Sequence, residues 1–179
     1  MLARLRDEGF SEFRGQLPLL PIAAGRLQPA GRVLEEPKNS ENPELYAVFP
    51  FRLIGVGKPS LELGRKTFFT RRVKDDVGGW RQDGIQAAYL GLTDTAREYV
   101  ERNFAKKHAG SRFPAFWGPN FDWIPDQDHG NANMIALQRM LLQADDGKIY
   151  LLPAWPKEWD VDFKLHAPWG VVVLSLIHI

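Results

Sequence analysis

The residues best suited to chemistry lie in one polar loop that leads into an apolar helix. From Trp117 the sequence WGPNFDWIPDQDHGN mixes aromatic rings with carboxylates and amides. Aromatic rings stack on the faces of sugar rings, and carboxylates bind hydroxyls and move protons, so this composition is typical of a carbohydrate site. The candidate residues of the loop are Trp117, Asn120, Asp122, Trp123, Asp126, Asp128, His129 and Asn131.

The residues after this loop must form the element that positions it. Apolar side chains recur at helical spacing from about Asn131, with Ile135, Leu137 and Leu141 among them. The loop carboxylates then lie near a helix N-terminus, where free backbone N–H groups and the helix dipole favour the ionised form. An alternative stays open, in which the Asp residues cap the helix and the Trp residues fill the core.

Two earlier polar clusters also precede expected helices. Asn42–Glu44 begins a helix expected to run to Gly57 with a kink at Pro50, and Gly78–Asp83 accompanies one over Trp80–Leu92. Further helices are expected from Pro59 to about Val73 and from Thr93 onward. The candidate binding residues of these clusters are Glu44, Trp80, Gln82 and Asp83.

Paired helices joined by short corners predict a mainly α fold. We expect residues 1–145 to form part of an (α/α)6 toroid of helical hairpins, and residues 146–173 to begin a β-domain after a turn at Asp145–Gly147. In a toroid, alternate helices have their N-termini on one face, so the three polar clusters would share one mouth.

The last six residues, LSLIHI, match the in-frame translation of a transposon end used in preparing DNA for sequencing. We expect residues 174–179 to be this adaptor, and the chain to be a piece of a longer protein. The alternative is a native strand that continues from Val171–Val173.

Composition excludes several classes of function. A net charge of +1 gives no electrostatic reason to expect nucleic acid or an acidic membrane as a partner. The absence of cysteine excludes disulfides and thiolate chemistry. The Asp126–Gly130 stretch has only part of a calcium-loop pattern, so we expect no metal and no other cofactor.

Three blocks of the sequence resemble, in order and spacing, the closing part of glycoside hydrolase family 95. They are NPELYAVFPFRL, then GGWRQDGIQAAYLGLTDTAREYV, then FDWIPDQDHGNANMIALQRMLLQADDGKIYLLPAWP. The resemblance implies an (α/α)6 barrel followed by a β-sandwich, in inverting enzymes that act mainly on α-L-fucosides. It also implies an oligosaccharide or polysaccharide substrate and a secreted or periplasmic location, although residues 1–10 do not resemble a signal peptide.

The resemblance assigns roles to particular residues. Counted back from MLLQ, the carboxylate of the family's base falls on Asp128, and the general acid falls upstream of this chain, so we expect the chain alone to be inactive. Glu44 and Asp122 stand where the family has histidines, which implies a divergent member in which the fucose pocket is not preserved. The alternative function is a carbohydrate-binding or scaffold protein without catalysis.

Overall fold

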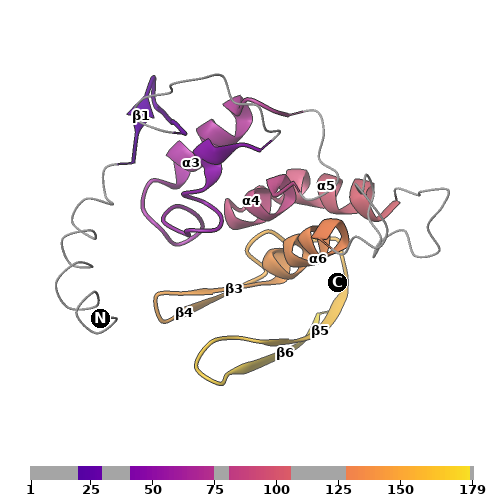
Figure 1. The fold of residues 1–179 in the computed structure, drawn as a ribbon. Coiled ribbons are helices and arrows are strands. Elements are labelled where there is room, and N and C mark those ends of the chain that lie inside the picture. Colours follow the sequence, from indigo (N-terminus) through magenta and orange to yellow (C-terminus); the bar gives the residue numbers. More distant parts are fainter. Residues whose placement is uncertain (1–19, 30–40, 75–80, 106–127, 178–179) are drawn as a thin grey trace, which may run out of the picture.

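The structure is a computed structural model that describes residues 20–29, 41–74, 81–105 and 128–177. In Figure 1, the hairpin of residues 22–27 and the helix Leu61–Thr70 lie at one end of the molecule. The helices between residues 83 and 141 pack side by side in the middle, and the hairpins of residues 142–151 and 161–177 lie at the other end. The described helices are η2 (Pro43–Leu45), α3 (Leu61–Thr70), α4 (Asp83–Tyr89), α5 (Thr93–Ala105) and α6 (Asp128–Leu141). The described strands are β1 (Ile22–Ala23), β2 (Arg26–Leu27), β3 (Leu142–Asp145), β4 (Lys148–Leu151), β5 (Val161–His166) and β6 (Val172–Ile177).

Helix α4 forms the centre of the core. It has only seven residues, and all of them are buried, so tertiary packing rather than length holds it in helical form. Both α5 and α6 pack closely against α4 at Gly84. A Cβ placed on Gly84 would lie 3.3 Å from the Cβ of Ala136 in α6 and 3.7 Å from the Cβ of Tyr99 in α5. Near the other end of α4, the carbonyl of Ala88 accepts a 2.8 Å hydrogen bond from Gln143. Helices α4 and α6 therefore run in the same direction.

The strands pair as three antiparallel hairpins, β1–β2, β3–β4 and β5–β6. The predicted turn between β3 and β4 is confirmed, with Asp146 at φ 48° and Gly147 at φ 73° between the paired ends Asp145 and Lys148. Two successive residues with positive φ are the mark of a type I′ turn. Leu174–Ile177 lie in β6 and pair with β5, as the strand alternative for these residues requires.

The expected fold class is wrong. Within the described residues there are four α-helices and three two-stranded sheets, and no ring of repeated helix pairs that would make a partial (α/α)6 toroid. The helix expected from Asn42 to Gly57 is reduced to the single turn η2, and the chain then continues as turns. Pro50 has no N–H to continue a helix, and Arg52 and Gly57 have positive φ, which an α-helix does not accommodate.

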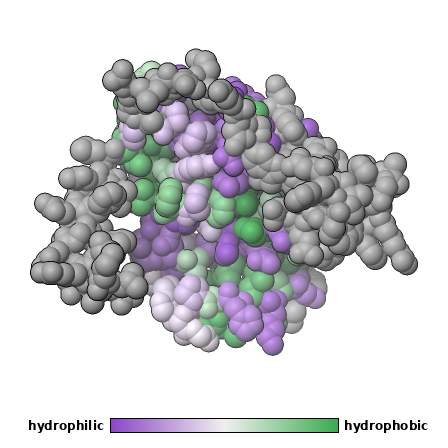
Figure 2. Space-filling model, in the orientation of Figure 1, coloured by the Kyte–Doolittle hydropathy of each residue, from purple (hydrophilic) through white to green (hydrophobic). Residues whose placement is uncertain are grey.

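Both hydrophobic and hydrophilic residues reach the face shown in Figure 2. Among the described residues, Leu174 and Phe51 have the most exposed large apolar side chains, with exposed fractions of 69% and 66%. None of the described helices is long and apolar enough to cross a membrane.

The packing of α3 generates a prediction at Gly64. Helix propensity alone would favour Gly64→Ala by about 1 kcal/mol. A Cβ at this position, however, would lie 2.7 Å from both Ile54 Cγ2 and Leu90 Cδ2, inside the core. We expect the steric overlap to outweigh the gain in helix propensity. The unfolding free energy of Gly64→Ala, measured by urea denaturation, should therefore be about 1–2 kcal/mol lower than that of the wild type. Glu62→Ala, on the exposed side of the same helix, should change it little; a stabilised Gly64→Ala would show that the contact relaxes.

Candidate functional site

Asp83, a candidate from the sequence, begins α4 and lies within a buried ion-pair network. Its side chain is 4% exposed. Arg71 Nε lies 2.6 Å from Oδ1, and Arg81 approaches Oδ2 with Nη2 at 3.0 Å and Nε at 3.1 Å. Both carboxylate oxygens therefore accept from guanidinium groups, which makes Asp83 a fixed structural anion.

Arg71 connects three helices through this network. It follows α3 directly, and its Nη1 donates to the Phe68 carbonyl at 2.6 Å while its guanidinium stacks over the Phe68 ring at 4.0 Å. Its Nη2 donates to the Tyr99 hydroxyl of α5 at 2.7 Å. Every nitrogen of the guanidinium thus has a partner, and the end of α3, the start of α4 and the middle of α5 are held around one side chain.

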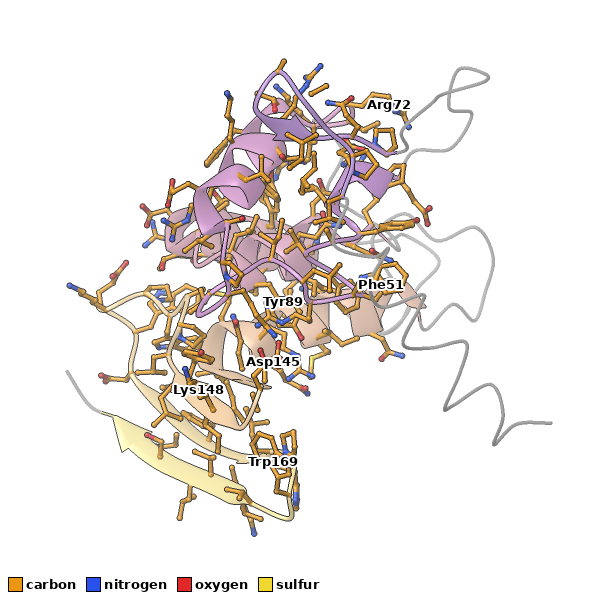
Figure 3. The ribbon with its side chains drawn as sticks, turned by 90° about the vertical axis from the view of Figure 1, so that its left-hand side faces the viewer. Phe51, Arg72, Tyr89, Asp145, Lys148 and Trp169 are labelled. Carbon is orange, nitrogen blue, oxygen red and sulfur yellow. The ribbon has the colours of Figure 1, made fainter. Side chains whose placement is uncertain are left out.

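Asn42 and Glu44 attach the η2 turn to the segment after α3. The Asn42 amide bonds the backbone of Val73 in both directions at 2.9 Å, and its Nδ2 also lies 3.3 Å from Asp83 Oδ1. Glu44 Oε1 accepts a 3.0 Å hydrogen bond from the backbone N–H of Arg72, the residue labelled near one end of the molecule in Figure 3. The structure therefore brings the first two predicted clusters together, through bonds within the fold.

A small cavity lies between this network and the η2 segment. It is lined by Glu41, Asn42, Tyr46, Arg81, Gln82, Asp83 and Gln86. At its rim, the Tyr46 hydroxyl donates to the Glu41 carboxylate. That hydrogen bond, with burial and the negative charge of Glu41, raises the pKa of Tyr46 to about 12.

The third predicted cluster is described only in part. Asp128 is the first residue of α6, His129 follows it in the first turn, and Asn131 is exposed. Asp128 precedes Ala136, the neighbour of Gly84, by eight residues, so at 1.5 Å per residue α6 extends roughly 10 Å beyond the start of α4. The structure therefore does not place Asp128 beside Asp83. The candidates Trp80, Trp117, Asn120, Asp122, Trp123 and Asp126 lie outside the described residues.

A second group of charges joins the loop after η2 to the β3–β4 hairpin. Arg52 Nε and Lys58 Nζ lie 3.3 Å and 3.1 Å from Asp145 Oδ2, and Arg52 stacks on the Tyr89 ring at 4.0 Å. Figure 3 labels Asp145 and Tyr89. Burial lowers the pKa of Arg52. A hydrogen bond from Lys58 lowers the pKa of Asp146, in the turn of the hairpin. This group holds the hairpin in place.

The sequence analysis missed Arg71 and Arg81 as partners of Asp83, and Tyr99 as a partner of Arg71. A signal was present, because an aspartate within an apolar stretch such as DGIQAAYL must be paired if it is buried. Arg71 and Tyr99, however, are 12 and 16 residues away, on other elements. No group of three or more acidic or histidine side chains that could hold a metal occurs among the described residues.

Neither the protein-family models nor the curated proteins with which the chain was compared give a match. The resemblance to glycoside hydrolase family 95 therefore rests on the three sequence blocks alone.

The network generates a prediction about stability. Arg71→Met leaves Asp83 buried with one of its guanidinium partners gone, and removing one member of a buried ion pair costs about 3–5 kcal/mol. The control is Arg97→Met, whose partly exposed side chain pairs with Asp94 and Glu158 and should cost about 1 kcal/mol or less. Equal losses in urea denaturation would contradict a special role for Arg71.

A second prediction concerns the pH dependence set by Tyr46. A pKa raised from 10.0 to about 12 in the folded state favours the protonated phenol, so the contribution to stability is complete below pH 10. It is lost as pH rises from 10 toward 12. The unfolding free energy of the wild type should therefore fall more steeply over this range than that of Tyr46→Phe. Glu41→Gln should flatten the difference, and parallel curves for all three proteins would exclude the effect.

Proposed function

We propose that the chain is part of an inverting glycoside hydrolase that acts on an α-L-fucoside-like or related glycosidic bond. In this proposal Asp128 serves as the base, or activates the base, and the general acid lies upstream of residue 1. The substrate is an oligosaccharide or polysaccharide. Support comes from the three sequence blocks and from the aromatic and acidic composition of residues 117–131.

The observation that carries the proposal is the position of Asp128 as the first residue of α6. A carboxylate at a helix N-terminus lies at the positive end of the dipole, near backbone N–H groups that have no partner within the helix. The helix is also held firmly. Asn133 donates to the Val100 carbonyl of α5 at 3.3 Å, and Ala136 packs against Gly84 of α4. A catalytic group needs such a rigid support.

The ion-pair network decides what Asp83 does in this proposal. An inverting enzyme needs an acid and a base about 6.5–9.5 Å apart, with room for a water molecule between them. Asp83 does not fit the part of the acid, because its two oxygens accept from Arg71 and Arg81 inside the core. It acts instead to position α4, and the acid must come from another part of the protein.

A carbohydrate-binding protein without catalysis is the second candidate. It is favoured by the finding that two predicted binding carboxylates, Glu44 and Asp83, bond within the fold. Such a protein would show no turnover of glycosides with either residue at position 128, so rate measurements on the two forms separate the candidates.

In the intact enzyme, with its upstream acid, Asp128→Asn should lower kcat by roughly 10²–10⁴ and change KM little. The swap is nearly isosteric and keeps much of the capping ability, so the loss would follow from the missing charge. Initial rates on aryl glycosides measure the effect. The matched control is Asp94→Asn, an exposed carboxylate in the first turn of α5, which should leave kcat unchanged.

The 179-residue chain by itself serves as the blank for this assay, since one carboxylate cannot serve both faces of the bond. Full kcat with Asn at position 128 would move the base elsewhere, whereas binding of glycosides without turnover, with either residue at position 128, would favour the binding protein.

A further inference from the structure

Three buried polar atoms without a hydrogen-bond partner belong to residues that line the cavity beside Asp83. They are Arg81 Nη1, Gln82 Oε1 and Gln86 Oε1, all on residues that line it. The burial is deep, since Gln86 is 2% exposed and Arg81 is 6% exposed. An unpaired buried polar atom costs about 1–3 kcal/mol, so three around one cavity indicate that something else satisfies them.

Neighbouring bonds keep the Arg81 guanidinium in place. Arg81 is fixed by its two contacts with Asp83 and by a 3.0 Å hydrogen bond from its Nη2 to the Val73 carbonyl. Gln82 and Gln86 lie one turn apart at the start of α4, on the same side of the helix. Three residues that line the cavity, Glu41, Tyr46 and Gln82, are only half-buried.

The size of the cavity limits what can enter. Its volume of about 10 Å³ admits one water molecule or one hydroxyl group, and no sugar ring. The chemistry limits it further. A carboxylate or phosphate would face two amide oxygens and the carboxylate of Glu41, whereas an ammonium group would face the Arg81 N–H. A neutral hydroxyl both accepts and donates, so it can bond Arg81 Nη1 and one of the glutamine oxygens at once.

We propose that this cavity is a specificity subsite that binds a single hydroxyl group of a neutral sugar, with Arg81 Nη1 donating to it and Gln82 or Gln86 accepting from it. The subsite rests on the proposed carbohydrate function and adds to it. It is separate from Asp128, which begins a different helix. The hydroxyl replaces a water molecule that occupies the cavity when no ligand is bound.

The test is a double-mutant cycle between protein and ligand, using the full 179-residue chain. Binding of methyl α-L-fucopyranoside, methyl α-D-galactopyranoside and methyl β-D-xylopyranoside is measured by NMR titration, together with the monodeoxy analogues of any glycoside that binds. For the wild type we expect one deoxy analogue to bind about tenfold more weakly than its parent, the value of roughly one hydrogen bond. In Gln86→Leu or Gln82→Leu, whichever removes the accepting amide, that ratio should fall toward one.

Two further variants keep the result clear. Gln82→Leu, at a half-buried position, repeats the measurement should Gln86→Leu fail to fold by circular dichroism. Gln138→Leu, a half-buried glutamine of α6 outside the cavity, should keep the tenfold ratio.

Each outcome decides between the two proposals. Sugar binding with the same deoxy ratio in all variants means that the cavity holds a resident water only, and it overturns the subsite while leaving the proposed function. Absence of binding for every glycoside also overturns the subsite. A ratio that collapses in Gln86→Leu or Gln82→Leu, alongside full kcat in Asp128→Asn, supports the subsite and overturns the role of Asp128 as the base.

Discussion

The structure depends on the burial of Asp83 between two arginines. Moving a carboxylate and a guanidinium out of water costs several kcal/mol each, and their attraction compensates only where every remaining donor and acceptor is satisfied. Arg71 meets that condition through Asp83, the Phe68 carbonyl and the Tyr99 hydroxyl. Since these partners belong to three different helices, only one arrangement of α3, α4 and α5 satisfies the charge. The ion pair therefore specifies the packing more than it stabilises it.

Close packing around α4 fixes the positions of α6 and of the β3–β4 hairpin, on the side of α4 away from α3 (Figure 1). The small residues Gly84 and Ala136 let α4 and α6 approach closely, and Gln143, fully buried, bonds the Ala88 carbonyl at the point where α6 gives way to β3. Leu142 is also buried, so the first strand of the hairpin begins inside the core. The β3–β4 hairpin is in this way fixed to α4, whose N-terminus the ion pair positions.

Local patterns in the sequence predicted much of the secondary structure. Helices α3 to α6 and the Asp146-Gly147 turn follow from apolar spacing and turn chemistry. The toroid failed because it required a helix through Pro50, where the chain instead turns. The pairing of Asp83 with Arg71 and Arg81 could not be predicted in the same way, since it depends on tertiary contacts that no periodicity records. Residue types at the site were therefore predictable, whereas their partners were not.

The same network explains why amides rather than acids remain available at this site. Asp83, Asn42 and Glu44 bond groups within the fold, so their oxygens serve the fold. Gln82 and Gln86, next to them on α4, keep buried oxygens without partners, and such departures from full satisfaction are expected at functional positions. Because Asp83 holds Arg81 in place, the residues around the cavity keep one unpaired donor, Arg81 Nη1, and two unpaired neutral acceptors, the side-chain oxygens of Gln82 and Gln86. A surface of that kind discriminates by hydrogen bonding rather than by charge, which suits an uncharged polyhydroxyl ligand.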